Sequence, residues 1–168
     1  MGTPFFVYGT LLLDVGQPNT HYWLGAAERH ASAVLHEASL FAHPSFPMML
    51  LGESGAGHVR GQVVWVRPDD YERVLRSLDA LEEFDPDNAD ASLYLRARVN
   101  VQLEADGTTV ECFTYCAKTV ADVANLPKIE SGDWVEFCTR EPSRLDWWHE
   151  QARSGADVRE QATTTQQQ

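Results

Sequence analysis

A short apolar run that stops at a glycine, near the start of the chain, constrains the fold most strongly. Phe5-Phe6-Val7-Tyr8 is an unbroken apolar and aromatic run, and Gly9 follows it directly. Such a run is typical of a strand buried on both faces, because a half-exposed strand alternates apolar and polar residues. We therefore expect residues 5–8 to form an interior strand that breaks into a tight turn.

Strand patterns recur farther along the chain. Further strands are expected at residues 61–66, 98–103 and 110–115, where β-branched and aromatic residues gather or alternate with polar ones. Asp106-Gly107, between the last two of these segments, is a hairpin signal. Residues 31–41 are mixed in character and fit either a strand or a short helix.

A helix is expected between the second and third strands. Pro68-Asp69-Asp70 marks its start, since acidic residues suit the positive end of the helix dipole, and its pattern runs to about Phe84. A terminal helix is expected within residues 134–151, and there is no internal repeat. This arrangement predicts an α+β fold with helices outside a mixed or closed sheet, and not a doubly wound one.

The composition bounds the classes of partner. The chain of 168 residues is expected to form one domain over residues 1–152, with a disordered polar tail at 153–168. A net charge of −12 argues against nucleic acid and anionic membrane surfaces, because both need a basic footprint. Three cysteines, no signal-peptide pattern and no apolar run of about 18 residues favour a reduced cytoplasmic protein.

Helical periodicity selects one carboxylate near the end of the central helix. At about 100° per residue, Leu75, Leu78 and Leu81 belong to one apolar stripe. Glu82 lies about 45° from the centre of that stripe and Glu83 about 145° from it, so Glu82 points toward the core. A frayed helix end that turns Glu82 out to solvent is the alternative. Burial would raise the pKa of Glu82, which suits a group that accepts and donates a proton.

The turn Tyr8-Gly9-Thr10-Leu11 can offer backbone N–H groups to a ligand. It is not a P-loop, because the Gly-Lys-Ser/Thr ending is absent, and it is not a dinucleotide fingerprint, because the later glycines are missing. An ordinary strand-to-turn transition is the alternative interpretation. Together with one buried acid, such a turn would be a minimal set of groups for amide chemistry on a small substrate.

Short motifs occur in a fixed order between residues 5 and 134. They are Phe6-Val7-Tyr8-Gly9-Thr10-Leu11, Phe46-Pro47, Gly61-Gln62-Val63, Leu78-Asp79-Ala80-Leu81-Glu82, Tyr94-Leu95-Arg96-Ala97-Arg98-Val99, Phe113-Thr114-Tyr115 and Ile129-Glu130-Ser131-Gly132-Asp133-Trp134. In this order and spacing they resemble the γ-glutamylcyclotransferase family, including its γ-glutamylamine cyclotransferase and AIG2-like branches. The stretch between Glu82 and Tyr94 is longer than in compact members of that family.

The resemblance implies a small mixed β-barrel with flanking helices and a cavity at the end of the first strand. It implies cyclisation of a small-molecule γ-glutamyl amide to 5-oxoproline, with release of an amine or peptide and with no metal or cofactor. Glu82 would be the catalytic acid and base. The residues implied for substrate binding are Tyr8, Gly9, Thr10, Leu11 and Tyr115. Glutathione, γ-glutamyl dipeptides, γ-glutamyl-lysine and a γ-glutamyl secondary metabolite all fit this reaction.

Other residues carry two interpretations each. Arg96 either pairs with an acid or contacts a substrate carboxylate. The acidic segment 85–92 is either a lid that favours amine leaving groups or inert surface. Cys112 and Cys116 share one face of a strand, without the spacing of a zinc site or an adjacent base for a nucleophile. His43 either approaches the pocket or belongs to the surface.

Two other functions are compatible with the same residues. One is a non-catalytic descendant that binds a small metabolite or a protein, and the other is hydrolysis or acyl transfer with an outside nucleophile. A buried acid without a partner favours the cyclotransferase over the binding module, which gains nothing from such a group. The pKa of Glu82 and the product, 5-oxoproline or free glutamate, distinguish the three functions.

Overall fold

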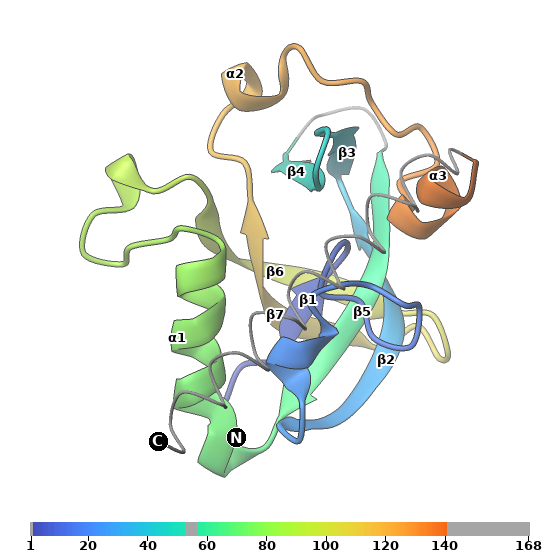
Figure 1. Ribbon diagram of the computed structural model, residues 1–168. Coiled ribbons are helices and arrows are strands. Elements are labelled where there is room, and N and C mark those ends of the chain that lie inside the picture. Colours follow the sequence, from blue (N-terminus) through green and yellow to red (C-terminus); the bar gives the residue numbers. More distant parts are fainter. Residues whose placement is uncertain (1, 53–56, 141–168) are drawn as a thin grey trace, which may run out of the picture.

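Five strands of the computed structural model close into a barrel in the order β1-β5-β2-β6-β7, and β3 pairs with β4 in a separate sheet (Figure 1). The structure describes residues 2–52 and 57–140. The strands of this part are β1 (Phe5–Val7), β2 (Ala27–His36), β3 (Ala38–Ala42), β4 (Pro47–Leu51), β5 (His58–Val66), β6 (Leu95–Leu103) and β7 (Thr109–Cys116). The predicted α+β class, a small mixed barrel with flanking helices, is confirmed.

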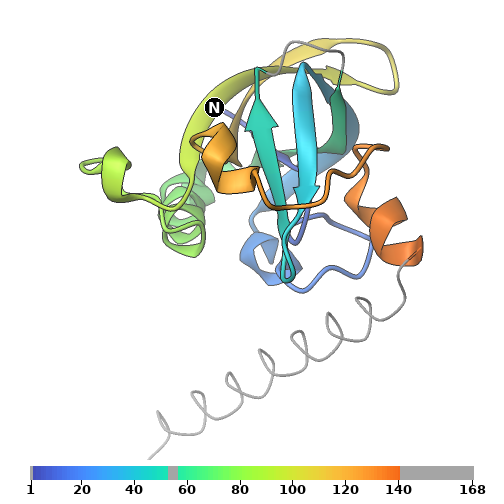
Figure 2. The ribbon, with the colours of Figure 1, turned by 90° about the horizontal axis from the view of Figure 1, so that it is seen from above.

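Three helices and three short 3₁₀ turns accompany the strands of the described chain. They are α1 (Tyr71–Leu81), α2 (Val120–Val123), α3 (Trp134–Arg140), η1 (Thr20–Trp23), η2 (Pro68–Asp70) and η3 (Ala89–Ala91). α1 and α3 lie on opposite sides of the barrel (Figure 2). None of the described helices is long and apolar enough to cross a membrane.

β1 is the strand that closes the barrel. It pairs antiparallel with β5 and parallel with β7, so that Phe5 lies opposite both Val64 and Phe113. All three residues of β1 are buried, as the unbroken apolar run predicted. A Cβ on Gly61 of β5 would lie 2.2 Å from the carbonyl oxygen of Val7, so glycine permits this close strand contact.

The two-stranded sheet follows a sharp turn after β2. Glu37, between β2 and β3, has a φ of 56°, and this left-handed residue bends the chain from one strand into the next without a helix. Residues 31–41 therefore belong to two strands. The sequence analysis missed β4, because a proline at the first position of a short strand weakens the strand pattern.

The remaining predicted strands lie inside longer observed ones. The segments 61–66, 98–103 and 110–115 fall within β5, β6 and β7. The hairpin signal between β6 and β7 is confirmed, since Gly107 has a φ of 73° and Asp106 accepts the Thr108 N–H at 2.9 Å. β6 begins three residues earlier than predicted, at Leu95, because Arg96 continues its pairing with β7.

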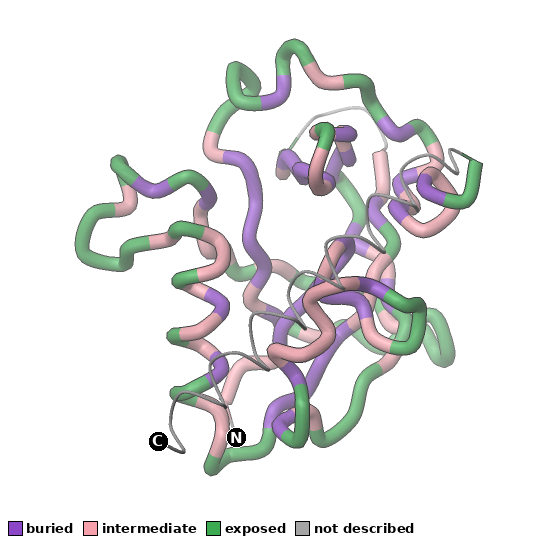
Figure 3. The backbone as a smooth tube through the Cα atoms, viewed as in Figure 1, coloured by how far each residue is buried: buried purple, intermediate pink, exposed green. Residues whose placement is uncertain are grey.

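α1 packs against the outside of the barrel through an apolar stripe. Val74 and Leu78 on this stripe are completely buried, and burial of each such side chain stabilises the fold by about 1.5–3 kcal/mol. Figure 3 shows the buried residues gathered on the barrel strands and on one side of α1, while the segment that follows α1 is mostly exposed.

α3 is the last helix of the described chain. α3 begins at Trp134, the first residue of the range within which a terminal helix was expected, and it is described to Arg140. Residues 141–151 of that expected helix and the predicted tail at 153–168 lie outside the described residues.

Candidate active site

Glu82 lies in a defined cap at the end of α1. Its backbone N–H donates to the carbonyl of Leu78 at 2.9 Å, so the residue keeps the direction that the helix imposes. Glu83 follows with a φ of 51°, and the N–H of Phe84 donates to the carbonyl of Asp79 at 2.9 Å. These bonds form a Schellman motif, in which a residue in the left-handed conformation ends the helix.

This cap corrects one prediction and confirms another. The helix was predicted to run to about Phe84, which was wrong: it ends at Leu81, because Glu83 adopts the left-handed conformation. Hydrophobic periodicity gives no sign of such a conformation at a residue other than glycine. The predicted side-chain directions are confirmed, since Glu82 is partly buried and Glu83 is exposed.

Glu82 lies close to two tyrosines, Tyr8 and Tyr94. Burial raises the pKa of both tyrosines, and the charge of Glu82 adds to this rise, so all three side chains are within electrostatic reach. Within the described part of the chain, no residue donates a hydrogen bond to the Glu82 carboxyl. Burial raises the pKa of Glu82 from 4.5 to about 7. Near neutral pH the group therefore exists in both protonation states, as an acid–base catalyst must.

Hydrogen bonds to its carbonyl groups hold the turn that follows β1. The Gly9 carbonyl accepts the backbone N–H three residues farther on at 3.1 Å. Asn19 donates its backbone N–H to the Thr10 carbonyl and its side-chain amide to the Thr10 hydroxyl, both at 3.0 Å. The Leu11 carbonyl accepts the buried indole N–H of Trp23 at 2.7 Å. The turn is therefore rigid before any ligand binds.

Three N–H groups of the same turn have no hydrogen-bond acceptor among the described residues. Gly9, Thr10 and Leu11 donate no backbone hydrogen bond to any residue of the described chain, although Gly9 and Leu11 are buried. Buried backbone donors without a partner are rare in folded proteins. Successive N–H groups at a turn bind anions, so this turn has the donors for a carboxylate or an oxyanion.

Pro47 and Gln62 hold the two ends of the turn. Gly9 packs so closely on Pro47 that a Cβ on Gly9 would lie 2.4 Å from the proline Cγ. The Gln62 side chain accepts the Leu13 N–H at 2.8 Å and donates to the Leu13 carbonyl at 3.1 Å. Sequence reasoning missed Gln62 and Trp23, because Gln62 had no role in its motif and Trp23 lies in none.

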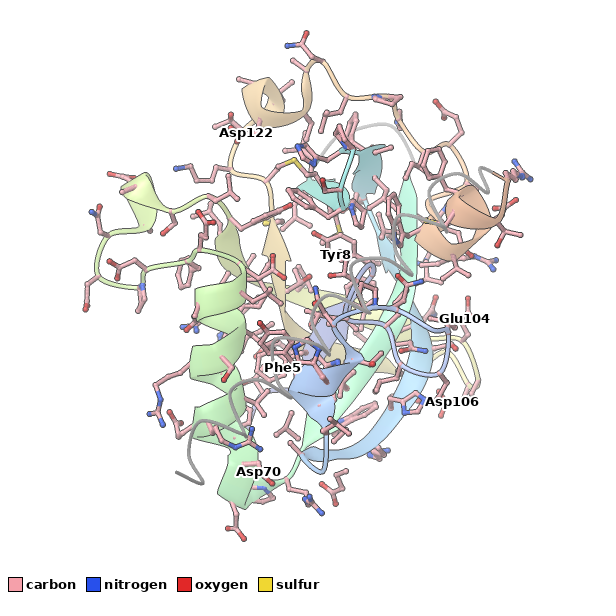
Figure 4. The ribbon with its side chains drawn as sticks, viewed as in Figure 1. Phe5, Tyr8, Asp70, Glu104, Asp106 and Asp122 are labelled. Carbon is pink, nitrogen blue, oxygen red and sulfur yellow. The ribbon has the colours of Figure 1, made fainter. Side chains whose placement is uncertain are left out.

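Tyr8 and Tyr115 are brought together from opposite ends of the chain. Tyr8 lies between the barrel and the β3–β4 sheet (Figure 4), and its buried hydroxyl donates to the backbone carbonyl of Tyr115 at 2.7 Å. The Tyr115 side chain points elsewhere, because its hydroxyl donates to Asp79 at 2.7 Å. The charge of Glu82 reaches Tyr8, while Tyr115 accepts the Tyr8 hydroxyl through its backbone and contacts Asp79 through its side chain.

Arg96 pairs with an acid, which was one of its two predicted roles. Its guanidinium donates to both carboxylate oxygens of Asp79, at 2.7 and 2.5 Å. The side chains of Arg96 and Asp79 are only 17% and 14% exposed. Arg96 also lies over the ring of Phe84, with 5.0 Å between the guanidinium carbon and the ring centroid. The pair connects the end of α1 to β6.

Tyr94 is a candidate site residue that the sequence analysis did not select. Its side chain is 4% exposed, and its ring meets that of Phe46 edge-on at 6.2 Å. The His43 ring stacks on the same Phe46 ring, with 4.1 Å between the two ring centroids. The signal was present, because Tyr94 opens the Tyr-x-Arg motif, but only the fold shows that it lies within electrostatic reach of Glu82. His43 therefore approaches the site through an aromatic neighbour.

The acidic segment 85–92 has its own hydrogen bonds. The buried Ser92 hydroxyl accepts the Asp85 N–H at 2.8 Å and donates to the Asn88 carbonyl at 3.2 Å. Lys118 donates to the Asp90 carbonyl at 2.6 Å, which ties the segment to the chain after β7. The segment is therefore an ordered projection beside α1, and its role in substrate choice stays a prediction.

The cysteines are buried and carry no sign of a nucleophile. Cys112 and Cys116 lie on one face of β7, as predicted, and burial raises their pKa to about 12 and about 11. A thiol with such a pKa is almost entirely protonated at neutral pH. The described residues contain no group of three His, Cys, Asp or Glu side chains that could hold a metal ion.

Comparison with known proteins identifies the family. A family model described as γ-glutamyl cyclotransferase, AIG2-like, matches residues 5–136. The chain belongs to this family. The match covers all of the predicted motifs and ends just inside α3, so the residues of the candidate site all lie within the part that defines the family.

Relatives of this AIG2-like chain agree with the assignment. A γ-glutamylaminecyclotransferase from Bos taurus is 35% identical over 141 residues, which is 77% of this chain and 75% of that protein. The crystal structure of an AIG2-like protein from Mus musculus has a TM-score of 0.55 and 27% identity, covering 78% of this chain and 88% of that one.

A more distant structure shares the fold alone. An uncharacterized protein from Pyrococcus horikoshii has a TM-score of 0.55 and 19% identity, and the match covers 84% of this chain and 98% of that one. The AIG2-like barrel is therefore found in proteins of low sequence similarity.

Proposed function

We propose that this AIG2-like protein cyclises a γ-glutamyl amide to 5-oxoproline and releases an amine. One observation carries the proposal: Glu82, whose pKa burial raises to about 7, lies close to Tyr8, which precedes a turn whose N–H groups bind no acceptor in the described chain. The name of the bovine relative, γ-glutamylaminecyclotransferase, supports an amine as the leaving group.

The proposed reaction moves one proton between two nitrogens. The α-amine nitrogen of the glutamyl group attacks the carbonyl carbon of its own side-chain amide, and a C–N bond closes a five-membered lactam. The C–N bond to the leaving amine breaks, and the proton lost by the attacking nitrogen is delivered to the leaving one. Glu82 takes this proton as a base and returns it as an acid. The reaction balances without a metal or a cofactor.

The turn after β1 meets the second requirement, which is a partner for negative charge. The N–H groups of Gly9, Thr10 and Leu11 suit the α-carboxylate of the substrate or the oxyanion that develops on the amide carbonyl. Because the attack is intramolecular, the remaining task is to hold the glutamyl chain in a folded, near-attack shape. The hydrogen bonds that the carbonyl groups of this turn accept hold its N–H groups in place, so these N–H groups can serve both tasks.

The direct test is 5-oxoproline release from a panel of γ-glutamyl amines and γ-glutamyl peptides. Wild type, Glu82→Gln and Glu83→Gln are compared, since Glu83 is the exposed neighbour of Glu82 and serves as a matched control. We expect release by wild type and by Glu83→Gln, with Glu82→Gln reduced at least about 100-fold, as expected for loss of general acid–base catalysis. Undiminished release by Glu82→Gln would overturn the mechanism.

The product also tests the other two functions. Free glutamate in place of 5-oxoproline would indicate hydrolysis with water as the outside nucleophile. No product from any member of the panel, together with an ordinary pKa near 4.5 for Glu82, would indicate a binding protein. A γ-glutamyl amide that raises the melting temperature without turnover would then be its ligand.

A further inference from the structure

Asp79 holds the end of α1 from two directions. Its carboxylate accepts two bonds from Arg96, at 2.7 and 2.5 Å, and one from the Tyr115 hydroxyl at 2.7 Å. Arg96 belongs to β6 and Tyr115 to β7, so one side chain joins the helix to two barrel strands. Its backbone carbonyl accepts the Phe84 N–H, which is the bond that closes the cap around Glu82.

Phe84 completes the connection on the far side of Glu82. Its ring lies 6.5 Å from that of Tyr115, and the guanidinium carbon of Arg96 lies 5.0 Å from its centroid. Asp79 before Glu82 and Phe84 after it therefore contact the same two barrel residues. Glu82 lies between two attachments, although its own carboxyl accepts no bond from the described residues.

The energetics of the Asp79–Arg96 pair point to a geometric role. Both side chains are largely buried, and removing two charges from water costs several kcal/mol, which their attraction roughly offsets. A buried pair of this kind adds little net stability compared with apolar residues of similar volume. The pair instead fixes the position of the end of α1 relative to the barrel.

We propose that Asp79 is a positioning residue, which places the carboxyl of Glu82 near Tyr8 by fastening the end of α1 to Arg96 and Tyr115. The proposal rests on the proposed function of Glu82 as the acid and base. In the Leu-Asp-x-x-Glu motif, the glutamate would supply the catalytic carboxyl and the aspartate would orient it.

A measurable consequence concerns the titration of Glu82. The groups around it are Tyr8 and Tyr94 on the barrel side, and Asp79 with its partner Arg96 on the helix side. Burial raises the pKa of its carboxyl to about 7, and the carboxyl accepts no hydrogen bond from the described residues. If the helix end moves outward, water reaches the carboxyl, its pKa falls toward 4.5, and its electrostatic effect on Tyr8 weakens.

The experiment replaces the whole pair so that the net charge does not change. Asp79→Ala with Arg96→Met removes one negative and one positive charge, which separates loss of position from a purely electrostatic shift. The matched control is Glu111→Ala with Arg98→Met. Arg98 of β6 and Glu111 of β7 form an exposed ion pair at 2.6 Å. The Glu82 carboxyl is titrated by ¹³C NMR, with Glu82→Gln to assign the signal.

We expect the midpoint of Glu82 to fall by one pH unit or more in the Asp79–Arg96 double variant and to stay unchanged in the control. The kcat for 5-oxoproline release should fall about 10–100-fold with little change in KM, as misplacement of a catalytic group predicts. A double variant that loses only unfolding free energy, with the midpoint and kcat of wild type, would show a merely structural pair and overturn the proposal.

Two further results keep the test decisive. If the double variant does not fold, Tyr115→Phe removes one of the three bonds to Asp79 and should lower the Glu82 midpoint by a smaller amount; no change would overturn the proposal. If wild type releases no 5-oxoproline but the midpoint falls as expected, the positioning role stands and the proposed function fails.

Discussion

The hydroxyl of Tyr8 donates a hydrogen bond of 2.7 Å to the backbone carbonyl of Tyr115, a residue 107 positions farther along the chain. The bond joins the residue that follows β1 to the end of β7. These two strands have a single residue pair in register, Phe5 with Phe113. The turn after β1 therefore depends on β7 for its position. Glu82, beside Tyr8, depends on the same strand through Asp79 and the Tyr115 hydroxyl.

Tyr8→Phe should destabilise the fold by about 1–3 kcal/mol, because it leaves a buried carbonyl without its donor. It should also lower kcat/KM, since the turn and Glu82 lose a shared neighbour. Urea denaturation and 5-oxoproline release measure the two effects. Tyr71→Phe is the control, because the Tyr71 hydroxyl also donates to a backbone carbonyl, that of Thr3 at 2.8 Å. Equal losses of activity in both variants would contradict a local role for Tyr8.

Glu82→Gln should make the protein more stable at alkaline pH. Because the folded-state pKa is raised from 4.5 to about 7, the folded state binds more protons than the unfolded state between these values. Wild-type stability therefore falls as the pH rises through this range, whereas glutamine does not titrate. The variant should gain about 1–3 kcal/mol relative to wild type between pH 4 and pH 8, measured by urea denaturation. The same gain in stability in Glu83→Gln would show that the effect does not come from the raised pKa of Glu82.

Trp23→Phe should impair substrate binding at the turn after β1. The substitution removes the indole donor to the Leu11 carbonyl while it keeps an aromatic ring in the core. We expect kcat/KM to fall about 10-fold, because a looser turn holds its N–H groups less well. Trp65→Phe, at another buried tryptophan, is the control for lost ring volume. If both variants lose stability and activity alike, the indole bond has no specific role.

Glu83→Gly should stabilise the protein by about 0.5–1 kcal/mol, because glycine adopts the left-handed conformation without strain. Glu83 is exposed and has a φ of 51°, so no buried contact is lost. Ala80→Gly, one turn earlier on the exposed face of α1, should cost about 1 kcal/mol instead. Thermal or urea denaturation measures both changes, and a loss in Glu83→Gly would mean that the cap needs the glutamate side chain.

Neutralising the segment 85–92 should alter the choice of leaving group. Asp87→Asn with Asp90→Asn should raise KM several-fold for substrates with a cationic amine and leave KM for neutral amides unchanged, with unchanged stability. Coulombic attraction of exposed charges is screened, so the difference should shrink at high salt. Glu104→Gln with Asp69→Asn makes the same change in charge elsewhere. No difference between the two double variants would indicate an inert surface.

The candidate site could be predicted only in part, because some of its features depend on neighbouring residues in the sequence and others on contacts between distant segments. The direction of Glu82 follows from the spacing of Leu75, Leu78 and Leu81 on one helix, and the turn after β1 follows from a glycine after an apolar run. The partners of Asp79 were beyond such reasoning. Neither local spacing nor residue type shows that Arg96, 17 residues away, and Tyr115, 36 residues away, meet it.

The sequence by itself determined the strand run, the amphipathic α1, the hairpin at Asp106-Gly107 and the face of α1 that carries Glu82, because each depends on short-range periodicity or turn chemistry. Tertiary structure decided the order of the barrel strands, the raised pKa of Glu82 and the closure of the turn by Trp23 and Gln62. These properties arise from contacts between distant segments. Desolvation in particular exists only when surfaces from several elements close around one group.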